Sequence, residues 1–297
     1  MMRLLFLFAM LFIAGIIRAQ IKPPTLTAPM ADTAVIRKGV TQPQDGYYKK
    51  AVTFKPTELK PLPNVREADV LYAKRVWREI DTREKMNRYM NSPKQRLIDI
   101  LMKAIDAGTL TAYDAQSAPN NINGDGFANP LSPIQARRKM ADSTVVDIID
   151  NKTGDKTGSK VVAGEFNPDS VVKFRVKEDW VFEKQRAVYV LRIIGIAPMV
   201  KVNVAGINTT YQPAFWINFE QAKKLLANTE VFDANNNATG LSYADVFFKR
   251  LFTSYIIKQS NDKDERIRNY AQGIDNIYES DRIKKRLMDW EIDVWVY

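Results

Sequence analysis

The spacing of apolar residues changes along this chain from a helical period to a period of two. Between residues 70 and 84, apolar side chains recur at steps of three and four, at Val70, Ala73, Val76, Trp77 and Ile80. From Val171 onward, apolar and charged residues alternate one by one. The first pattern predicts an amphipathic helix and the second a half-buried strand. We therefore predict an α+β fold, in which an antiparallel sheet packs with several amphipathic helices.

The predicted helix over residues 70–84 carries opposite charges four positions apart. The pairs are Arg75–Glu79, Glu79–Arg83, Asp81–Lys85 and Glu84–Arg88. Residues four apart are neighbours on a helix, but an exposed pair contributes only about 0.3–0.5 kcal/mol. The apolar stripe must therefore hold this helix in place. Trp77, Arg78 and Asp81 are its candidate contact residues for a partner, and burial of Trp77 inside the subunit is the alternative.

Asn91, Ser92 and Pro93 predict a break, followed by a second helix that Ser92 caps and Gly108 ends. Residues 108–113 have the β-branched and aromatic composition of a strand.

A loop over residues 119–133 follows, and Ser132 is expected to cap a short helix that runs to Met140. Within the loop, Asn121, Asn123 and Asp125 alternate as the ligands of a calcium loop do, but Ser132 stands where that loop needs a glutamate. We interpret the segment as a turn-rich loop, with calcium as a minor alternative.

Residues 151–164 form a polar, glycine-containing connection, which makes them the best candidate for a subdomain boundary. Two strands then alternate over residues 172–179 and 188–194, and a turn at 183–186 joins them as an antiparallel hairpin. Further strands are predicted at 199–204 and 214–219. We expect Trp180, Phe215 and Trp216 to fill the space between the sheet and the helices.

The last third of the chain predicts four helices and a final strand. The helices begin near Glu220, after Ser242 (with an apolar face that extends to Ile256), near Ile267 and near Ile283. Residues 233–237 are read as a loop. Residues 289–297 alternate Trp290, Ile292, Val294 and Val296, which favours a strand at a sheet edge.

The N-terminus has the features of a secretory signal peptide. A positive start precedes a 14-residue apolar run over residues 4–17, shorter than the roughly 20 residues that span a bilayer. We predict cleavage after Ala19, which leaves Gln20 as the new N-terminus. Loss of Arg3 and Arg18 then lowers the formal charge from +10 to +8.

Residues 20–66 form a predicted extended arm, because half of the chain's 14 prolines lie there. Such an arm has no core of its own, so it is disordered, wraps its own domain or reaches a neighbour. Phe54 and Leu59 are its candidate docking residues. Residues 67–297 are predicted to form the globular domain.

The chain contains no histidine and no cysteine. This removes the usual general base, thiol catalysis and the commonest zinc ligands, so we predict a non-enzymatic protein without a metal or cofactor. The remaining enzymatic alternative is a carboxylate-based glycan hydrolase that uses Glu79 with Asp81, or Glu178 with Asp179. Residues two apart on a helix do not face each other, and adjacent strand residues point to opposite faces, so both pairs have poor geometry.

The positive charge favours contact with acidic surfaces, and a peripheral binder of anionic lipid or polysaccharide is the other alternative function. Nucleic acid is not a predicted partner, because the longest basic cluster is only Arg137, Arg138 and Lys139 and no reader motif is present.

Several stretches together resemble the gliding motility protein N family (GldN, also called PorN) of the type IX secretion system. They are DVLYAKRVWREID (69–81), REKMN (83–87), GTLTAY (108–113), KEDW (177–180), RIIGIAP (192–198), FW (215–216), FKRLF (248–252), YIIK (255–258) and WEIDVWVY (290–297).

The resemblance implies a non-enzymatic periplasmic component of the secretion and gliding machinery, peripheral to the outer membrane. It implies a lipoprotein partner, the K protein (GldK/PorK), with which copies of the subunit form a ring. It also implies contact with the periplasmic part of the inner-membrane motor, the M protein (GldM/PorM). The family carries no catalytic motif that would mark residues here.

Overall fold

The structure is a computed structural model of the 297-residue chain. It describes residues 56–59, 64–141, 143–149, 156–163, 166–204, 207–232 and 240–296, which all belong to the unit formed by residues 51–297. The predicted signal peptide, Phe54 and the predicted loop at 233–237 lie outside the described residues.

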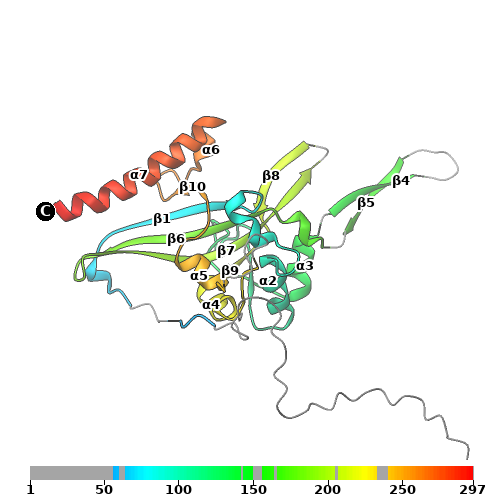
Figure 1. The fold of residues 1–297 in the computed structure, drawn as a ribbon. Helices are drawn as coiled ribbons and strands as arrows, with labels where there is room; N and C mark the ends of the chain where they lie inside the picture. Colours follow the sequence, from blue (N-terminus) through cyan, green and yellow to red (C-terminus); the bar gives the residue numbers. More distant parts are fainter. Residues whose placement is uncertain are drawn as a thin grey trace, which may run out of the picture. The chain divides into compact units, whose positions relative to one another are not determined.

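An eight-stranded antiparallel sheet organises these residues, in the order β10-β1-β6-β7-β9-β2-β3 with β8 paired to β7 (Figure 1). Its strands are β1 (Val70–Asp81), β2 (Ala112–Asp114), β3 (Pro130–Leu131), β6 (Lys173–Glu183), β7 (Val188–Val204), β8 (Ile207–Pro213), β9 (Phe215–Asn218) and β10 (Tyr255–Gln259). The predicted hairpin is confirmed as β6 and β7. The predicted α+β class is confirmed by the helices that pack on this sheet.

The helices are α2 (Leu97–Asp106), α3 (Pro133–Met140), α4 (Phe219–Ala227), α5 (Tyr243–Phe248), α6 (Ile267–Tyr270) and α7 (Ile274–Val296). Short 3₁₀ turns occur at η1 (Glu67–Asp69), η2 (Lys85–Asn91) and η3 (Pro168–Ser170). None of the helices in the described residues is long and apolar enough to cross a bilayer.

The predicted helix over residues 70–84 is wrong, because this segment is strand β1. Its first half alternates between half-buried and exposed side chains, and its second half is buried on both faces between β6 and β10. A spacing of four residues fits a strand as well as a helix, since four is a multiple of two. Arg75 and Glu79 therefore share one face of β1, and they pair with residues of the neighbouring strand.

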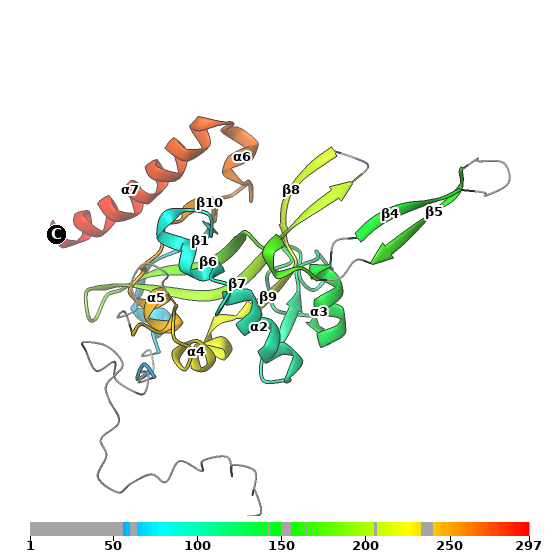
Figure 2. The same ribbon diagram turned by 45° about the vertical axis from the view of Figure 1, so that its right-hand side comes forward.

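The main apolar core lies where α2, α4 and α5 cover the sheet (Figure 1). Phe174, Val176 and Ile80 supply the sheet side of this core, and Leu101, Leu226 and Phe247 supply the helix side. A smaller core forms where α7 runs along β10 and β1, and it contains Val76, Trp180, Ile256, Ile283 and Leu287 (Figure 2). The expectation of rings between sheet and helices is confirmed for Trp180 and Phe215, but Trp216 packs instead in a small cluster with Trp77 and Ala197.

The predicted second helix is α2, and Gly108 follows its end with a φ of +68°. Its predicted start is wrong: Ser92 closes η2, and the helix begins at Leu97 after Arg96, without a side-chain cap. The helix at 133–140 is confirmed as α3, where Ser132 and Gln135 form a capping box.

Residues 156–163, predicted as part of a polar connection, form β5 (Lys156–Ala163) instead. This strand pairs with β4 (Ser143–Ile149) in a separate two-stranded sheet (Figure 2). The predicted strand at 199–204 is the continuation of β7 and not a separate element.

Two predictions near the C-terminus are also corrected. The helix that Ser242 caps ends at Phe248, and Tyr255 and Ile256 belong to β10, which pairs with β1. The final strand is wrong as well, because α7 continues without a break to Val296. Burial of Ile283 and Leu287, four residues apart, keeps this segment helical, and Trp290 stacks on Tyr72 with ring centroids 3.9 Å apart.

Candidate functional site

Two cross-strand ion pairs lie on one face of β1 and β6. Arg75 lies opposite Asp179 in the register, and its Nε and Nη2 donate to the carboxylate at 2.6 and 2.8 Å. Glu79 lies opposite Arg175 and accepts from its Nη2 at 2.6 Å. The two strands therefore carry complementary charges in reverse order, which fixes their antiparallel register.

Glu79 is buried and accepts a second hydrogen bond from the Tyr255 hydroxyl at 2.8 Å, with the Lys173 ammonium 3.7 Å away. Burial works to raise the pKa of Glu79, but Arg175, Tyr255 and Lys173 outweigh it and hold the pKa below its ordinary value. Glu79 is thus a charged structural carboxylate.

Glu178 occupies the opposite face of β6 and is fully buried. It accepts from Arg78 Nε at 2.5 Å, Arg250 Nη2 at 2.6 Å and Trp180 Nε1 at 2.8 Å. Burial works to raise its pKa, but the two guanidinium groups hold the pKa of Glu178 below its ordinary value. Along β6, Glu178 lies between Val176 of the main core and Trp180 of the α7 core.

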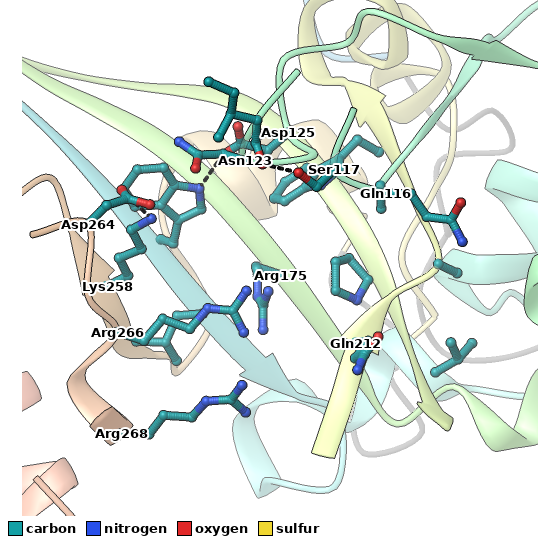
Figure 3. A pocket seen from close by; sticks show the side chains of 18 of the residues that line it. Gln116, Ser117, Asn123, Asp125, Arg175, Gln212, Lys258, Asp264, Arg266 and Arg268 are labelled. Carbon is teal, nitrogen blue, oxygen red and sulfur yellow. Dashed lines mark hydrogen bonds and ion pairs between the residues drawn. The ribbon is translucent and has the colours of Figure 1, made fainter. Parts of the chain in front are cut away.

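A pocket of about 740 Å³ opens on the face that carries Trp77 and Arg175 (Figure 3). Its apolar wall contains Val200, Pro213, Trp216 and Ile257. Its charged lining contains Lys139, Arg175, Lys258, Arg266 and Arg268, with Asp125 and Asp264 as the acids. These groups are positioned by strands β6 to β10, by helices α3 and α6, by the segment before α6 and by the loop after β2.

The loop after β2 forms one wall of the pocket. Asp125 accepts from Trp77 Nε1 at 2.7 Å, and its carbonyl accepts from Lys177 Nζ at 2.6 Å. Burial lowers the pKa of Lys177, and Asp125 opposes that shift. The Asn121 side chain accepts from the Gly126 amide at 2.9 Å. Asp125 thus holds the loop to β1 and β6, and no group of three His, Cys, Asp or Glu side chains that could hold a metal ion occurs in the described ranges.

Arg175, Arg266 and Arg268 project toward the same open space from different elements (Figure 3). Lys139 and Lys258 have acidic partners, Asp114 at 2.7 Å and Asp264 at 2.5 Å. Arg266 and Arg268 have no ion pair or side-chain hydrogen bond within the part of the chain that the structure describes. Burial and the charges of Arg175 and Arg268 lower the pKa of Arg266. The pocket therefore carries excess positive charge.

The strand assignment changes the argument about a carboxylate enzyme. Glu79 and Asp81 share a face after all, because they lie two apart on a strand. Arg83 holds the pKa of Asp81 below its ordinary value against the effect of burial, and the pKa of Glu79 is lowered too. A general acid needs a raised pKa, so this pair is poorly suited to glycoside hydrolysis. Glu178 and Asp179 point to opposite faces, as expected.

The candidate contact residues fall into two groups. Trp77, Arg78 and Asp81 are 7, 5 and 8% exposed, so they offer little surface to a partner. Leu59 packs against the main core, and the neighbouring Thr57 donates from its amide to the Ala227 carbonyl at 3.2 Å. This part of the arm thus lies on its own domain.

The basic pocket is the feature that sequence reasoning missed. Arg266 and Arg268 flank Ile267, where the apolar spacing predicts a helix, and Arg175 lies on the charged face of a predicted strand, so neither pattern marks them as site residues. Three basic residues, Lys263, Arg266 and Arg268, do lie in this stretch, but Asp262, Asp264 and Glu265 balance their charge, so the sequence gives little sign of a basic site.

The family described as "Gliding motility associated protein GldN" matches residues 65–296 of this sequence, more than three quarters of the chain. The chain belongs to the GldN family. No curated protein matches it.

Membership makes the protein a component of the gliding motility and type IX secretion machinery. GldN is a structural component of that machinery and is not a known enzyme family. The matched region of this GldN protein contains the whole sheet, both cores and the basic pocket, whereas nearly all of the predicted arm precedes it.

Proposed function

We propose that this GldN protein is a non-enzymatic structural subunit of the periplasmic, outer-membrane-associated ring of the type IX secretion system. It assembles with copies of itself and with an outer-membrane lipoprotein of the GldK/PorK family. It also contacts the periplasmic part of the GldM/PorM motor protein. The family match over residues 65–296 carries this proposal.

The chemistry of the sheet supports a structural role. The buried carboxylates Glu79 and Glu178 are each held by at least two hydrogen bonds from cationic or hydroxyl groups, and their pKa values are lowered. Such groups stay charged and fixed, which suits a rigid building block better than proton transfer. Ring subunits need head-to-tail contacts that close, and these call for a stable scaffold.

The test is purification of the tagged protein from detergent-solubilised outer membranes, followed by electron microscopy. We expect the lipoprotein to co-purify and closed rings to be visible. A protein that remains monomeric when the lipoprotein is supplied would contradict the proposal. Peptidoglycan cleavage that Glu79→Gln abolishes, while the protein stays folded, would replace it with the hydrolase alternative.

A further inference from the structure

We propose that the basic pocket between β8, β10 and α6 binds an acidic peptide segment of a partner protein. A carboxylate of that segment lies among Arg175, Arg266 and Arg268, and an adjacent apolar side chain lies against Val200 and Ile257. This inference rests on the proposed assembly function and names the chemistry of one contact in it.

Unpaired positive charge is the first observation. Arg266 is half-buried and Arg268 is exposed, and neither forms an ion pair among the described residues; the charges of Glu79 and Asp264 act on Arg266 only without direct contact. Asp264, the nearby acid in this segment, is engaged by Lys258 at 2.5 Å. Like charges held together on one wall repel each other, and an incoming anion removes that cost.

Arg175 is the second and independent observation. It is 6% exposed and lines the pocket, and Glu79 occupies its Nη2. Its buried Nε has no hydrogen-bond partner in the described structure. With Glu79 as its one hydrogen-bonded acid, this guanidinium is incompletely satisfied, so its charge would attract a second carboxylate in the pocket. Figure 3 shows this group pointing into the space that Arg266 and Arg268 also face.

The shape and lining of the pocket favour a peptide over a phosphate-rich surface. The pocket is recessed between the loop after β2, β8 and the segment before α6, where the flat surface of a bilayer has poor access. Its wall is partly apolar, with Val200, Pro213 and Ile257, and this suits a side chain next to a carboxylate. Arginine matches a planar carboxylate through two parallel bonds, as Arg75 and Asp179 do in this sheet.

The test uses the purified protein and the peptide acetyl-DEFDE-amide, with isothermal titration calorimetry as the readout. The uncharged counterpart acetyl-NQFNQ-amide and the peptide acetyl-DEGDE-amide report the charge and apolar contributions. The variant is Arg266→Glu with Arg268→Glu. Its matched control is Lys284→Glu with Lys285→Glu, two exposed residues of α7 that make the same change in net charge.

We expect acetyl-DEFDE-amide to bind the wild type, with at least tenfold weaker binding to the arginine variant and less than a twofold change in the lysine control. Binding should weaken several-fold between 50 and 300 mM salt, because the pocket charges are partly exposed. Both other peptides should bind less tightly. Circular dichroism checks the fold, and Arg268→Glu alone, at an exposed position, carries the test if the double variant unfolds.

Equal loss of peptide binding in both charge variants would overturn the proposal, as would no binding to the wild type at millimolar peptide. The pocket would be assigned to lipid instead if binding to phosphatidylglycerol vesicles depended on Arg266 and Arg268 while peptide binding did not. Peptide binding is measured without the lipoprotein, so a failed co-purification contradicts the ring proposal and leaves the pocket result unaffected.

Discussion

Replacing Glu178 by glutamine removes one negative charge from a site where it faces two arginines. Glu178 is fully buried and Arg78 is 5% exposed, so the Arg78 guanidinium cannot turn to water. Breaking a buried ion pair from one side costs about 3–5 kcal/mol, because it leaves an uncompensated buried charge. The Arg250 side chain is 29% exposed and can regain solvent, so we expect about 3 kcal/mol.

The assay is urea unfolding followed by circular dichroism. Asp179→Asn is the matched control, since Asp179 is the next residue on β6 but pairs with Arg75, whose side chain is 43% exposed. That pair is worth less than about 1 kcal/mol. The double variant Arg78→Met with Glu178→Gln should be more stable than Glu178→Gln alone, because the buried Arg78 charge is then gone and only Arg250, which reaches solvent, has lost its carboxylate. Equal unfolding midpoints for Glu178→Gln and Asp179→Asn would refute the reasoning.

Three further predictions concern pH, the pocket loop and the arm. The pKa values of Glu79 and Glu178 lie below their unfolded value near 4.5, and the pKa of Asp245 lies at about 2, so the unfolded chain binds more protons in acid. The contribution of these carboxylates to the free energy of unfolding should be complete above about pH 5 and should be lost as the pH drops from 4.5 toward 2. A free energy of unfolding that rises in acid would contradict these lowered pKa values. Gly124→Ala should destabilise the protein in thermal unfolding by well over the roughly 1 kcal/mol expected for the control Gly108→Ala. Both glycines have a positive φ, but only at Gly124 would the new Cβ lie 2.2 Å from a backbone oxygen, that of Ala115. Equal losses of stability would show that the loop adjusts to the added Cβ. Deletion of residues 20–55 should weaken ring assembly and leave the melting temperature unchanged, and intact rings after the deletion would show that these residues are not part of the interface. Thr57→Val should lower the melting temperature, because the Thr57 hydroxyl forms hydrogen bonds with Ser242 and Asp245.

Local chemistry was enough to predict several elements. Ser132 with Gln135 marks the start of α3, and Gly108 marks the end of α2, because capping depends on residues within one turn. The alternation over residues 172–179 and 188–194 predicted the β6–β7 hairpin, because successive residues of a strand point to opposite faces. The absence of histidine and cysteine restricted the chemistry from composition alone.

The tertiary structure alone decided the identity of β1 and the C-terminal segments. Arg75 and Glu79 lie four residues apart, so in a helix they could pair with each other. In a strand they pair instead with Asp179 and Arg175, about a hundred residues later in the sequence. Only the partner strand, with its charges in reverse order, selects the second solution. Tyr255 and Ile256 likewise became strand because β1 offered an unpaired edge.

The basic pocket shows the same limit. Arg175 lies far from Arg266 and Arg268 along the sequence, and the three converge only because β10 returns beside β1. The sequence by itself determined the fold class, the Ser132 cap of α3, the glycine after α2, the central hairpin and the lack of common catalytic groups, all of which depend on short-range chemistry. Long-range strand pairing decided which charges are neutralised and which remain available to a ligand, because an ion pair depends on distance in space and not along the chain.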